Sequence, residues 1–462
     1  MSAYSQKFSE AALAVNGRLY GDDKTFAGLG TDTRTLANGE LFVALQGPNY
    51  DAHDFVQDAL EKGAAGVLVQ RKLDVTVPQI VVPDTQVALG QLAAAWRQQF
   101  SIPVVAVTGS NGKTTVKEMI ASIFRQQGTV LSTRGNLNNE IGVPQTLLQL
   151  IGSHDSAIIE EGASHPGDIA YLTKLVKPTV AVVTNAAGAH LEGFGSLEAV
   201  ARTKGELFEH LPKNGTAIIN ADDDYASLWK SLAGKRNVLT FGLSANADVQ
   251  GNFHESVLQK SDELKGFHLD ITTPEGECSV TVPLMGCHNA MNALAATAAA
   301  LATGIKLDVI KKGLESITPV PGRLQKKVGI NNACILDDTY NANPASLNVA
   351  LDVLSSYPGE RYLALGDMAE LGEKSESFHE QAGRQARDSG VSHLYAIGEH
   401  SRFAVEAFGE QAWHFSAQDQ LVNRLREDMN ENVTLLVKGS RSSRMDQVVD
   451  ALVMPRAMGA SS

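Results

Sequence analysis

Short, wholly apolar runs alternate with longer amphipathic stretches in the middle of the chain. Val104–Val107 is the first such run, and Val116–Gln127 behind it repeats apolar residues at helical spacing. Three further runs follow at intervals long enough to hold helices between them: Ala157–Ile159, Val180–Val183 and Ala217–Ile219. Strands buried on both faces of a parallel sheet lack polar alternation. We therefore predict a central doubly wound α/β domain.

The first part of the chain has a different pattern. The apolar run Leu41–Leu45 ends in a turn, helical spacing covers Asp54–Lys62, and strand-like runs occur at 67–69 and 80–82. Short strands separated by one helix and several turns predict a small mixed domain. We expect this N-terminal domain to span residues 1–83.

A second alternation of strands and helices begins near Thr318. Four apolar runs lie in this part of the chain, at 334–336, 362–365, 394–397 and 433–437. They predict a smaller, Rossmann-like α/β domain over 318–462, which leaves 84–317 for the central domain. The proline-rich stretch Pro319–Gly322 is the expected hinge between the two.

Length and charge limit the classes of protein that the chain can belong to. A chain of 462 residues exceeds what one hydrophobic core usually supports, which agrees with an α/β protein of three domains. The formal net charge of −13 argues against a nucleic-acid binder, which normally presents a basic surface. The negative net charge does not exclude a polyanionic substrate, because a local basic loop can bind phosphate on an acidic protein.

Neither a membrane span nor a disulfide framework is expected. No window approaches the ~18 uninterrupted apolar residues of a membrane span, and the polar start Met1–Lys7 lacks the apolar core of a signal peptide. We therefore expect a cytoplasmic protein without membrane insertion. Cys278, Cys287 and Cys334 are odd in number and widely spaced, which predicts buried, reduced thiols and no zinc site.

A glycine-rich loop joins the first central strand to the following helix. Glycines let successive backbone N–H groups turn toward phosphate oxygens, the helix start adds its positive dipole end, and a lysine offsets the terminal phosphate charge. The hydroxyl after that lysine is a suitable Mg²⁺ ligand. The usual loop has a further glycine where this chain has Val107, so the motif is a shorter variant; a chance glycine turn is the alternative. The predicted nucleotide-binding residues are Gly109, Ser110, Asn111, Gly112, Lys113, Thr114 and Thr115.

Chemically versatile residues follow the next strands. Glu160 and Glu161 end the run Ala157–Ile159, where carboxylates would face the ligand crevice of an open α/β sheet, and one of them is a reasonable Mg²⁺ ligand. His190 follows another strand and could be a second metal ligand, although a loop histidine is more often a polar surface residue. Lys204 falls on a predicted helix, where its residue type alone favours a solvated charge.

Three polar clusters lie farther along the chain. His288 and Asn289 open an alanine-rich helix, where either ligand contact or capping explains them. The segment 337–344 gathers two carboxylates, three amide or hydroxyl groups and Tyr340 at a strand end. Lys438–Arg441 combines two positive charges with small residues, which suits a phosphate or a carboxylate.

The order of several segments is typical of one family. The chain resembles the Mur ligases of peptidoglycan synthesis over nearly its whole length. The matching segments are 31–34, 39–45, 108–115, 135–144, 162–167, 189–196, 204–206, 337–344, 366–372 and 437–441. Within the family, Asp338–Pro344 is typical of the member that adds a dipeptide, and the Asp-Asn-Pro-Arg signature of the diaminopimelate-adding member is absent.

The resemblance implies an ATP-dependent, ADP-forming amide ligase. Its expected partners are UDP-N-acetylmuramoyl-tripeptide and D-alanyl-D-alanine, joined by a monomer through an acyl phosphate. It also implies two Mg²⁺ ions, one on Thr114 and Glu160, the other on His190 and a carbamylated Lys204, with Lys113 on the phosphates. The family commonly has an aliphatic residue after the metal-binding glutamate, where this chain has Glu161, and the alignment favours Glu160 as the ligand.

The resemblance also assigns binding residues in all three domains. Asn289, Arg323 and Asp338 are expected at ATP, and Thr33, Arg34 and Gln46 at the uridine-diphosphate end. The remaining substrate-binding residues are expected to be Asn138, Asn139, Tyr340, Asn341 and Asn343. Folylpolyglutamate synthetase and the diaminopimelate-adding enzyme are the nearest alternatives, and a nucleotide-dependent switch is an alternative of another class.

Overall fold

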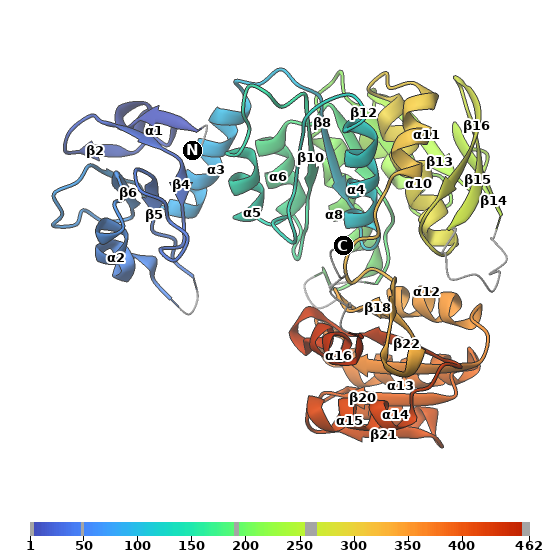
Figure 1. The fold of residues 1–462 in the computed structure, drawn as a ribbon. Helices are drawn as coiled ribbons and strands as arrows, with labels where there is room; N and C mark the ends of the chain where they lie inside the picture. Colours follow the sequence, from blue (N-terminus) through green and yellow to red (C-terminus); the bar gives the residue numbers. More distant parts are fainter. Residues whose placement is uncertain (1–3, 48–49, 189–193, 255–265, 455–462) are drawn as a thin grey trace, which may run out of the picture.

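The computed structural model describes residues 4–47, 50–188, 194–254 and 266–454. Three α/β parts follow one another along the chain and are drawn blue, green to yellow, and orange to red in Figure 1. Each part is built on its own sheet, of five, nine and six strands, and a separate two-stranded pair lies in the first part. The three-domain α/β fold expected from the sequence is confirmed, while the exact domain boundaries stay a prediction.

The first part holds a five-stranded sheet in the order β2-β7-β6-β5-β4. Only β2 runs antiparallel to its neighbour. The strands are β1 (Ser5–Lys7), β2 (Arg18–Tyr20), β3 (Thr25–Ala27), β4 (Leu29–Gly30), β5 (Leu41–Val43), β6 (Gly66–Val69) and β7 (Gln79–Val81). The helices are α1 (Phe8–Ala14), the 3₁₀ turn η1 (Ala52–Phe55) and α2 (Val56–Glu61).

The first part and the central part share one hydrophobic core. Helix α3 (Thr85–Arg97) joins them, and its Trp96 packs edge-on against Tyr4 with ring centroids 5.0 Å apart. Phe8 and Phe26 of the first part belong to the same buried cluster as the inner residues of the central sheet. Burial of apolar surface at this junction ties the two parts into one packed unit.

The central sheet has nine strands in the order β16-β15-β14-β13-β12-β11-β8-β10-β9. The strands from β9 to β14 in this order are parallel, and β14, β15 and β16 form an antiparallel edge that the sequence analysis did not anticipate. The strands are β8 (Val104–Thr108), β9 (Val130–Ser132), β10 (Ser156–Glu160), β11 (Val180–Val183), β12 (Thr216–Asn220), β13 (Asn237–Gly242), β14 (Val249–His254), β15 (Phe267–Thr273) and β16 (Gly276–Val282).

Helices cover both faces of the parallel strands. Alternate residues of each strand enter separate cores, so Val105 and Ile158 face α4 and α10 while Ala106 and Ile159 face α6 and α8. The helices are α4 (Lys113–Phe124), α5 (Gly142–Leu147), α6 (Asp168–Val176), α8 (Leu197–Glu209), α9 (Ala226–Ala233), α10 (Cys287–Leu301) and α11 (Leu307–Glu315). This doubly wound arrangement brings the ends of β8, β10 and β11 to one edge.

The third part has six strands in the order β17-β18-β22-β19-β20-β21, with β17 antiparallel and the others parallel. The strands are β17 (Gln325–Val328), β18 (Cys334–Asp338), β19 (Glu360–Gly366), β20 (His393–Ile397), β21 (Ala412–Phe415) and β22 (Val433–Lys438). The helices are α12 (Pro344–Ser355), α13 (Ser375–Asp388), α14 (Ser401–Phe408), α15 (Gln418–Asp428) and α16 (Met445–Leu452), with 3₁₀ turns η2 (Ile330–Asn332), η3 (Gly372–Lys374) and η4 (Arg441–Ser443). Its two hydrophobic cores are separate from those of the central part.

Two further expectations concern membranes and cysteines. Among the helices of the described residues, none combines the length and apolar character that a membrane crossing requires.

The three cysteines form no disulfide, as predicted, but the expectation that all are buried is wrong. Cys287 is exposed at the first turn of α10, and Cys278 and Cys334 are half-buried because they lie on β16 and β18 near sheet edges.

Candidate active site

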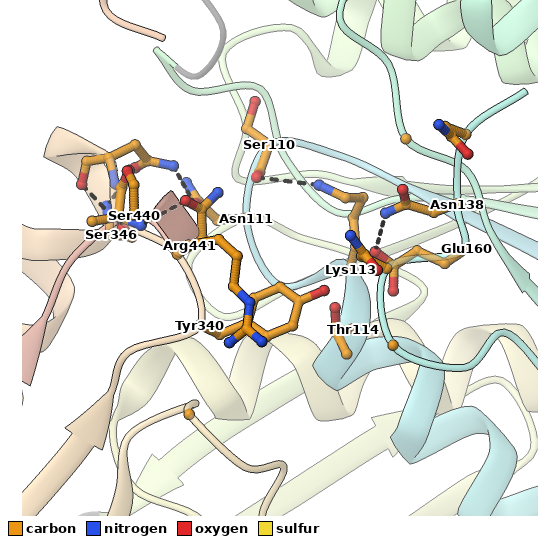
Figure 2. A pocket seen from close by; sticks show the side chains of 18 of the residues that line it. Ser110, Asn111, Lys113, Thr114, Asn138, Glu160, Tyr340, Ser346, Ser440 and Arg441 are labelled. Atoms are coloured by element: carbon orange, nitrogen blue, oxygen red, sulfur yellow. Dashed lines mark hydrogen bonds between the residues drawn. The ribbon is translucent and has the colours of Figure 1, made fainter. Parts of the chain in front are cut away.

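A cavity of about 1540 Å³ lies where the central and third parts meet. The central part contributes the glycine loop and the segments around Asn138 and Glu160 to the cavity wall. The third part contributes Arg323, Tyr340 and Arg441. Figure 2 shows Lys113, Asn138 and Glu160 on one side and Tyr340 and Arg441 on the other. The predicted nucleotide loop and the predicted polar cluster at 337–344, more than two hundred residues apart in the sequence, therefore line one cavity.

The glycine loop runs from β8 into α4 as the sequence predicts. Gly112 (φ 81°) precedes the first residue of the helix, and Gly109 (φ 145°) leaves no room for a side chain because an added Cβ would collide with Oγ1 of Thr184. The hydroxyl of Thr184 donates to the Asn111 carbonyl at 2.6 Å. Asn185 accepts the Asn111 N–H at 3.0 Å through Oδ1. The loop is thus preformed around the start of α4, where backbone N–H groups favour anions.

Lys113 lies folded over this loop. Its Nζ donates to the Gly109 carbonyl at 2.7 Å and contacts the Ser110 carbonyl at 3.4 Å. Burial lowers the pKa of this ammonium, Glu160 raises it and Arg323 lowers it further. An anionic phosphate in the cavity would restore the preference for the charged form.

Glu160 ends β10 and faces the cavity. Its Oε1 accepts from Nδ2 of Asn138 at 2.8 Å (Figure 2), and its Oε2 is buried and has no hydrogen-bond partner among the described residues. A buried carboxylate oxygen without a donor is costly unless a cation or a ligand completes it. Thr114 lies on the same wall of the cavity, so a hydroxyl and a carboxylate, both oxygen ligands of the kind Mg²⁺ prefers, line it together.

Glu161 points to the opposite face of the sheet. Its Oε2 accepts from Oγ1 of Thr173 on α6 at 2.9 Å, and the side chain is fully buried. Burial raises the pKa of this carboxyl to about 8, against a smaller lowering by the Thr173 hydroxyl. The two neighbouring glutamates therefore differ in environment, and Glu160 is the one that lines the cavity.

Lys204 is buried in α8, with 2% of its surface exposed. The residue type alone favoured a solvated charge, and that expectation is wrong because α8 packs this face against the sheet and α6. Burial first and the neighbouring charge of Lys113 second lower the pKa of the Lys204 ammonium to about 7. His190, the other residue expected at a second metal ion, lies outside the described residues.

Arg323 reaches from the third part to the glycine loop. Its guanidinium stacks 4.1 Å from the centre of the Tyr340 ring, and Nη2 lies 3.4 Å from Oγ1 of Thr114. Asn343 Nδ2 donates to Oδ1 of Asn111 at 2.9 Å. These contacts bring two of the predicted C-terminal residues directly to the predicted nucleotide loop.

Other residues of the polar cluster are bound within the third part. Asp338 accepts from Nζ of Lys438, which also donates to the carbonyl of Asn341 at 3.1 Å. Asp337 forms an ion pair with Lys327 at 2.8 Å. Asp338 therefore anchors the cluster in the structure, and its expected contact with ATP stays a prediction.

Some predicted residues lie away from the cavity lining. Asn289 is buried and donates to the carbonyl of Met285 at 2.7 Å. In the N-terminal part, Arg34 pairs with Asp32 at 2.6 Å, and Thr33 accepts from Lys62 through its carbonyl. Gln46 is exposed. Asn139 does line the cavity, where it accepts the Gly142 N–H at 2.9 Å.

Sequence reasoning missed two residues that shape the site. Asn185 follows β11 and fixes the glycine loop, and Lys117 lines the cavity from α4. Nothing in the local sequence distinguishes Lys117 from a solvated helix lysine.

Comparison with known proteins agrees with this geometry. Three family models match consecutive segments: "Mur ligase family, catalytic domain" at 25–97, "Mur ligase middle domain" at 107–300 and "Mur ligase, glutamate ligase domain" at 322–441. The chain belongs to the Mur ligase family. The resemblance inferred from the motifs is confirmed.

Individual relatives match this Mur ligase over nearly its full length. The UDP-N-acetylmuramoyl-tripeptide–D-alanyl-D-alanine ligase of Escherichia coli (strain K12) is 46% identical over 452 residues, which cover 97% of this chain and 98% of that protein. A crystal structure of MurF from Acinetobacter baumannii is 34% identical, with a TM-score of 0.90 and coverage of 97% and 99%. MurF ligase from Thermotoga maritima in complex with ADP is 28% identical, with a TM-score of 0.80 and coverage of 92% and 96%.

Proposed function

We propose that this Mur ligase joins D-alanyl-D-alanine to the terminal carboxylate of UDP-N-acetylmuramoyl-tripeptide, with release of ADP and phosphate. The observation that carries the proposal is one cavity lined by the glycine loop and by the segment 337–343, in a chain 46% identical to a ligase of that name over almost its whole length. The product is the pentapeptide precursor of peptidoglycan.

The chemistry requires that the acceptor carboxylate be activated, because a carboxylate is unreactive toward amines at neutral pH. An oxygen of the tripeptide carboxylate attacks the γ-phosphorus of ATP, the bond to the β-phosphate oxygen breaks, and ADP leaves. The neutral amine of D-alanyl-D-alanine then attacks the acyl carbon of the acyl phosphate. Loss of inorganic phosphate and of the amine proton completes the amide.

Residues of the glycine loop stabilise the charge on the phosphoryl group. Lys113 turns from its loop carbonyls toward the γ-phosphate, and the start of α4 donates backbone N–H groups. Thr114 and the unpartnered Oε2 of Glu160 fit a divalent cation, and Mg²⁺ held there would offset negative charge on the phosphate oxygens. Arg323 brings a second positive charge to the same loop from the other wall.

Lys204 is the proposed site of carbamylation. Burial lowers its pKa to about 7, so much of the amine is neutral at physiological pH and can add CO₂, with loss of one proton, to give a carbamate anion. That anion is an oxygen ligand suited to a second Mg²⁺, together with His190. Conversion of a buried cation into an anion also removes its repulsion from Lys113.

All three parts of the chain contribute substrate-binding residues in this proposal. Thr33, Arg34 and Gln46 take the uridine-diphosphate end, while Asn138 and Asn139 border the peptide. Tyr340, Asn341 and Asn343 line the amino-substrate side, and Asn289 and Asp338 complete the nucleotide site. We further propose that the enzyme works as a monomer in the cytoplasm.

The test is phosphate release with defined acceptor and amine pairs. The purified protein is incubated with ATP, Mg²⁺, UDP-N-acetylmuramoyl-tripeptide and D-alanyl-D-alanine, and each component is omitted in turn. We expect phosphate and pentapeptide product only when all are present. Turnover with a folate acceptor or with diaminopimelate as amine, and none with D-alanyl-D-alanine, would overturn the proposal. Slow ATP turnover independent of every acceptor would instead indicate a nucleotide-dependent switch.

A further inference from the structure

Lys117 is an almost fully buried lysine that lines the same cavity from α4. It lies one turn after Lys113 on α4, and 1% of its surface is exposed. Its Nζ donates to the carbonyl of Thr133 at 2.7 Å and pairs with Oε1 of Glu118 at 2.8 Å. The ammonium is therefore committed to protein partners, and one of them is a backbone carbonyl on the neighbouring loop.

Thr133 connects this lysine to the metal-binding carboxylate proposed above. It follows β9, the parallel neighbour of β10, and its N–H donates to the Ile158 carbonyl at 3.1 Å. Its Oγ1 accepts the backbone N–H of Glu160 at 2.9 Å. Thr133 is itself buried, and its N–H and Oγ1 both bond to the end of β10 while its carbonyl accepts from Lys117.

Asn138, at the other end of the same loop, also holds the end of β10. Its carbonyl accepts the Gly162 N–H at 2.7 Å, and its side-chain amide donates to Oε1 of Glu160 at 2.8 Å. The loop 133–138 thus holds Glu160 by both backbone and side chain. Glu160 lines the cavity, and its buried Oε2 has no hydrogen-bond partner among the described residues. Figure 2 shows the Asn138 amide beside Glu160 and Lys113.

Burial of an ammonium contributes little to the stability of a fold. Desolvation of a buried ion pair often exceeds its attraction, and an apolar residue of similar volume can be neutral or stabilising in its place. A methionine at 117 would fill much of the same space on the inner face of α4. The lysine at this position is therefore better explained by the loop carbonyl that it fixes than by a contribution to stability.

We propose that Lys117 is a positioning residue of this ligase: through Thr133 it holds the loop 133–138 and the end of β10 so that Glu160 binds a divalent cation. The inference rests on the proposed function only in taking Glu160 as the cation ligand. It assigns to Lys117 no contact with substrate or nucleotide. Its consequence is that cation affinity and loop geometry depend on a residue outside the set of direct ligands.

Binding of Mn²⁺ as the probe, measured by its electron paramagnetic resonance signal in the presence of a non-hydrolysable ATP analogue, tests this. We expect Lys117→Met to weaken Mn²⁺ binding about ten- to hundredfold, the usual effect of removing a residue that orients a metal ligand. Binding of the analogue without metal should stay within about twofold of the parent. Lys117→Arg keeps the charge and a donor, and we expect it to recover part of the affinity.

Two further variants separate positioning from loss of stability. Arg97 is another buried cation that donates to backbone carbonyls, to Val176 at 3.0 Å and Phe100 at 2.6 Å, but it lies in α3 and does not line the cavity. Arg97→Met should lower thermal stability without changing the Mn²⁺ affinity. Thr133→Val removes the acceptor for the Glu160 N–H. Its effect on Mn²⁺ affinity should not add to that of Lys117→Met, because both substitutions act through the loop 133–138.

Unchanged Mn²⁺ affinity in a folded Lys117→Met protein would overturn the inference. Equal weakening in Arg97→Met would do the same, since loss of stability alone would then account for the effect. The outcome is distinct from failure of the proposed function. A parent protein that binds Mn²⁺ with the analogue but does not use D-alanyl-D-alanine would refute the proposed reaction and leave Lys117 testable by the same titration.

Discussion

Asn343 donates a hydrogen bond from Nδ2 to Oδ1 of Asn111 over 2.9 Å and thereby connects the third part of the chain to the nucleotide loop. The other end of the same amide caps α12, where Oδ1 accepts the Ser346 N–H at 2.8 Å. One side chain therefore fixes the start of a C-terminal helix and contacts the glycine loop at once. This links the position of the third part to the geometry of the loop that is proposed to bind ATP.

Asn343→Asp should separate these two roles. A carboxylate still caps the helix but has no N–H for Asn111, so we expect thermal stability close to that of the parent and a several-fold rise in the KM for ATP. Asn343→Ala loses the cap as well and should cost about 1 kcal/mol of unfolding free energy. Steady-state kinetics with thermal unfolding checks both, and an Asp variant with parental KM would show that the contact is dispensable.

Lys113→Ala should abolish turnover and preserve the fold. The substitution deletes the charge beside the γ-phosphate but no part of a hydrophobic core, so we expect a loss of at least about a hundredfold in kcat/KM. Because burial lowers the pKa of the ammonium, its removal should leave the melting temperature unchanged or slightly raised. Full turnover in this variant would refute the assignment of the glycine loop to ATP.

Carbamylation of Lys204 should depend on pH in a defined direction. The lowered pKa of about 7 means that the reactive neutral amine increases as pH rises through 7. Formation of the carbamate releases a further proton. At constant CO₂ pressure and below saturation, the carbamate signal in ¹³C NMR with labelled CO₂ should therefore grow from pH 6 to pH 8 by more than the roughly tenfold rise of the neutral fraction. Lys204→Arg cannot form this carbamate and is the control; an identical signal in that variant would assign the modification elsewhere.

Lys204→Ala should be inactive and partly rescued by short carboxylates. Acetate or formate can occupy the space of the missing side chain and replace the carbamate as an anionic ligand. Rescue should be absent in Lys113→Ala, where the missing group is a cation. Activity of Lys204→Ala equal to that of the parent, without any additive, would refute the carbamate role.

Glu161→Gln should stabilise the protein increasingly as pH rises. The folded-state pKa of about 8 lies above the ordinary value of 4.5, so the folded protein keeps a proton that the unfolded chain has lost between these limits. Stability from this group is complete below about 4.5 and is lost as pH rises through 8. The difference in unfolding free energy between variant and parent should thus grow by up to about 1.4 kcal/mol per pH unit.

Denaturant titrations of the metal-free protein from pH 5 to pH 8 measure this difference. Glu160→Gln is the matched comparison, because it changes the neighbouring carboxylate that lines the cavity. It should lose Mg²⁺-dependent turnover, whereas Glu161→Gln should keep it. A pH-independent difference for Glu161→Gln would mean that the buried carboxyl is ionised in the folded protein.

The strands of the parallel sheets were predictable because their residues are apolar without interruption. Val104–Val107 and Val180–Val183 are buried on both faces, and no other local structure suits such short runs. The antiparallel edge was not predictable in the same way. Phe267–Thr273 alternates buried and exposed residues and forms a local hairpin with β16. The place of this hairpin at the edge of the central sheet beside β14 depends on long-range contacts, including those with α10.

The glycine loop, the family and the polar clusters were determined by the sequence alone, because residue types at fixed spacing carry that chemistry locally. Only the tertiary structure decided which of Glu160 and Glu161 lines the cavity, because adjacent strand residues face opposite sides of a sheet and meet different helices. It also decided that Lys204 and Lys117 are buried. The burial of a helix lysine depends on which surface packs over it, and that surface comes from residues far away in the chain.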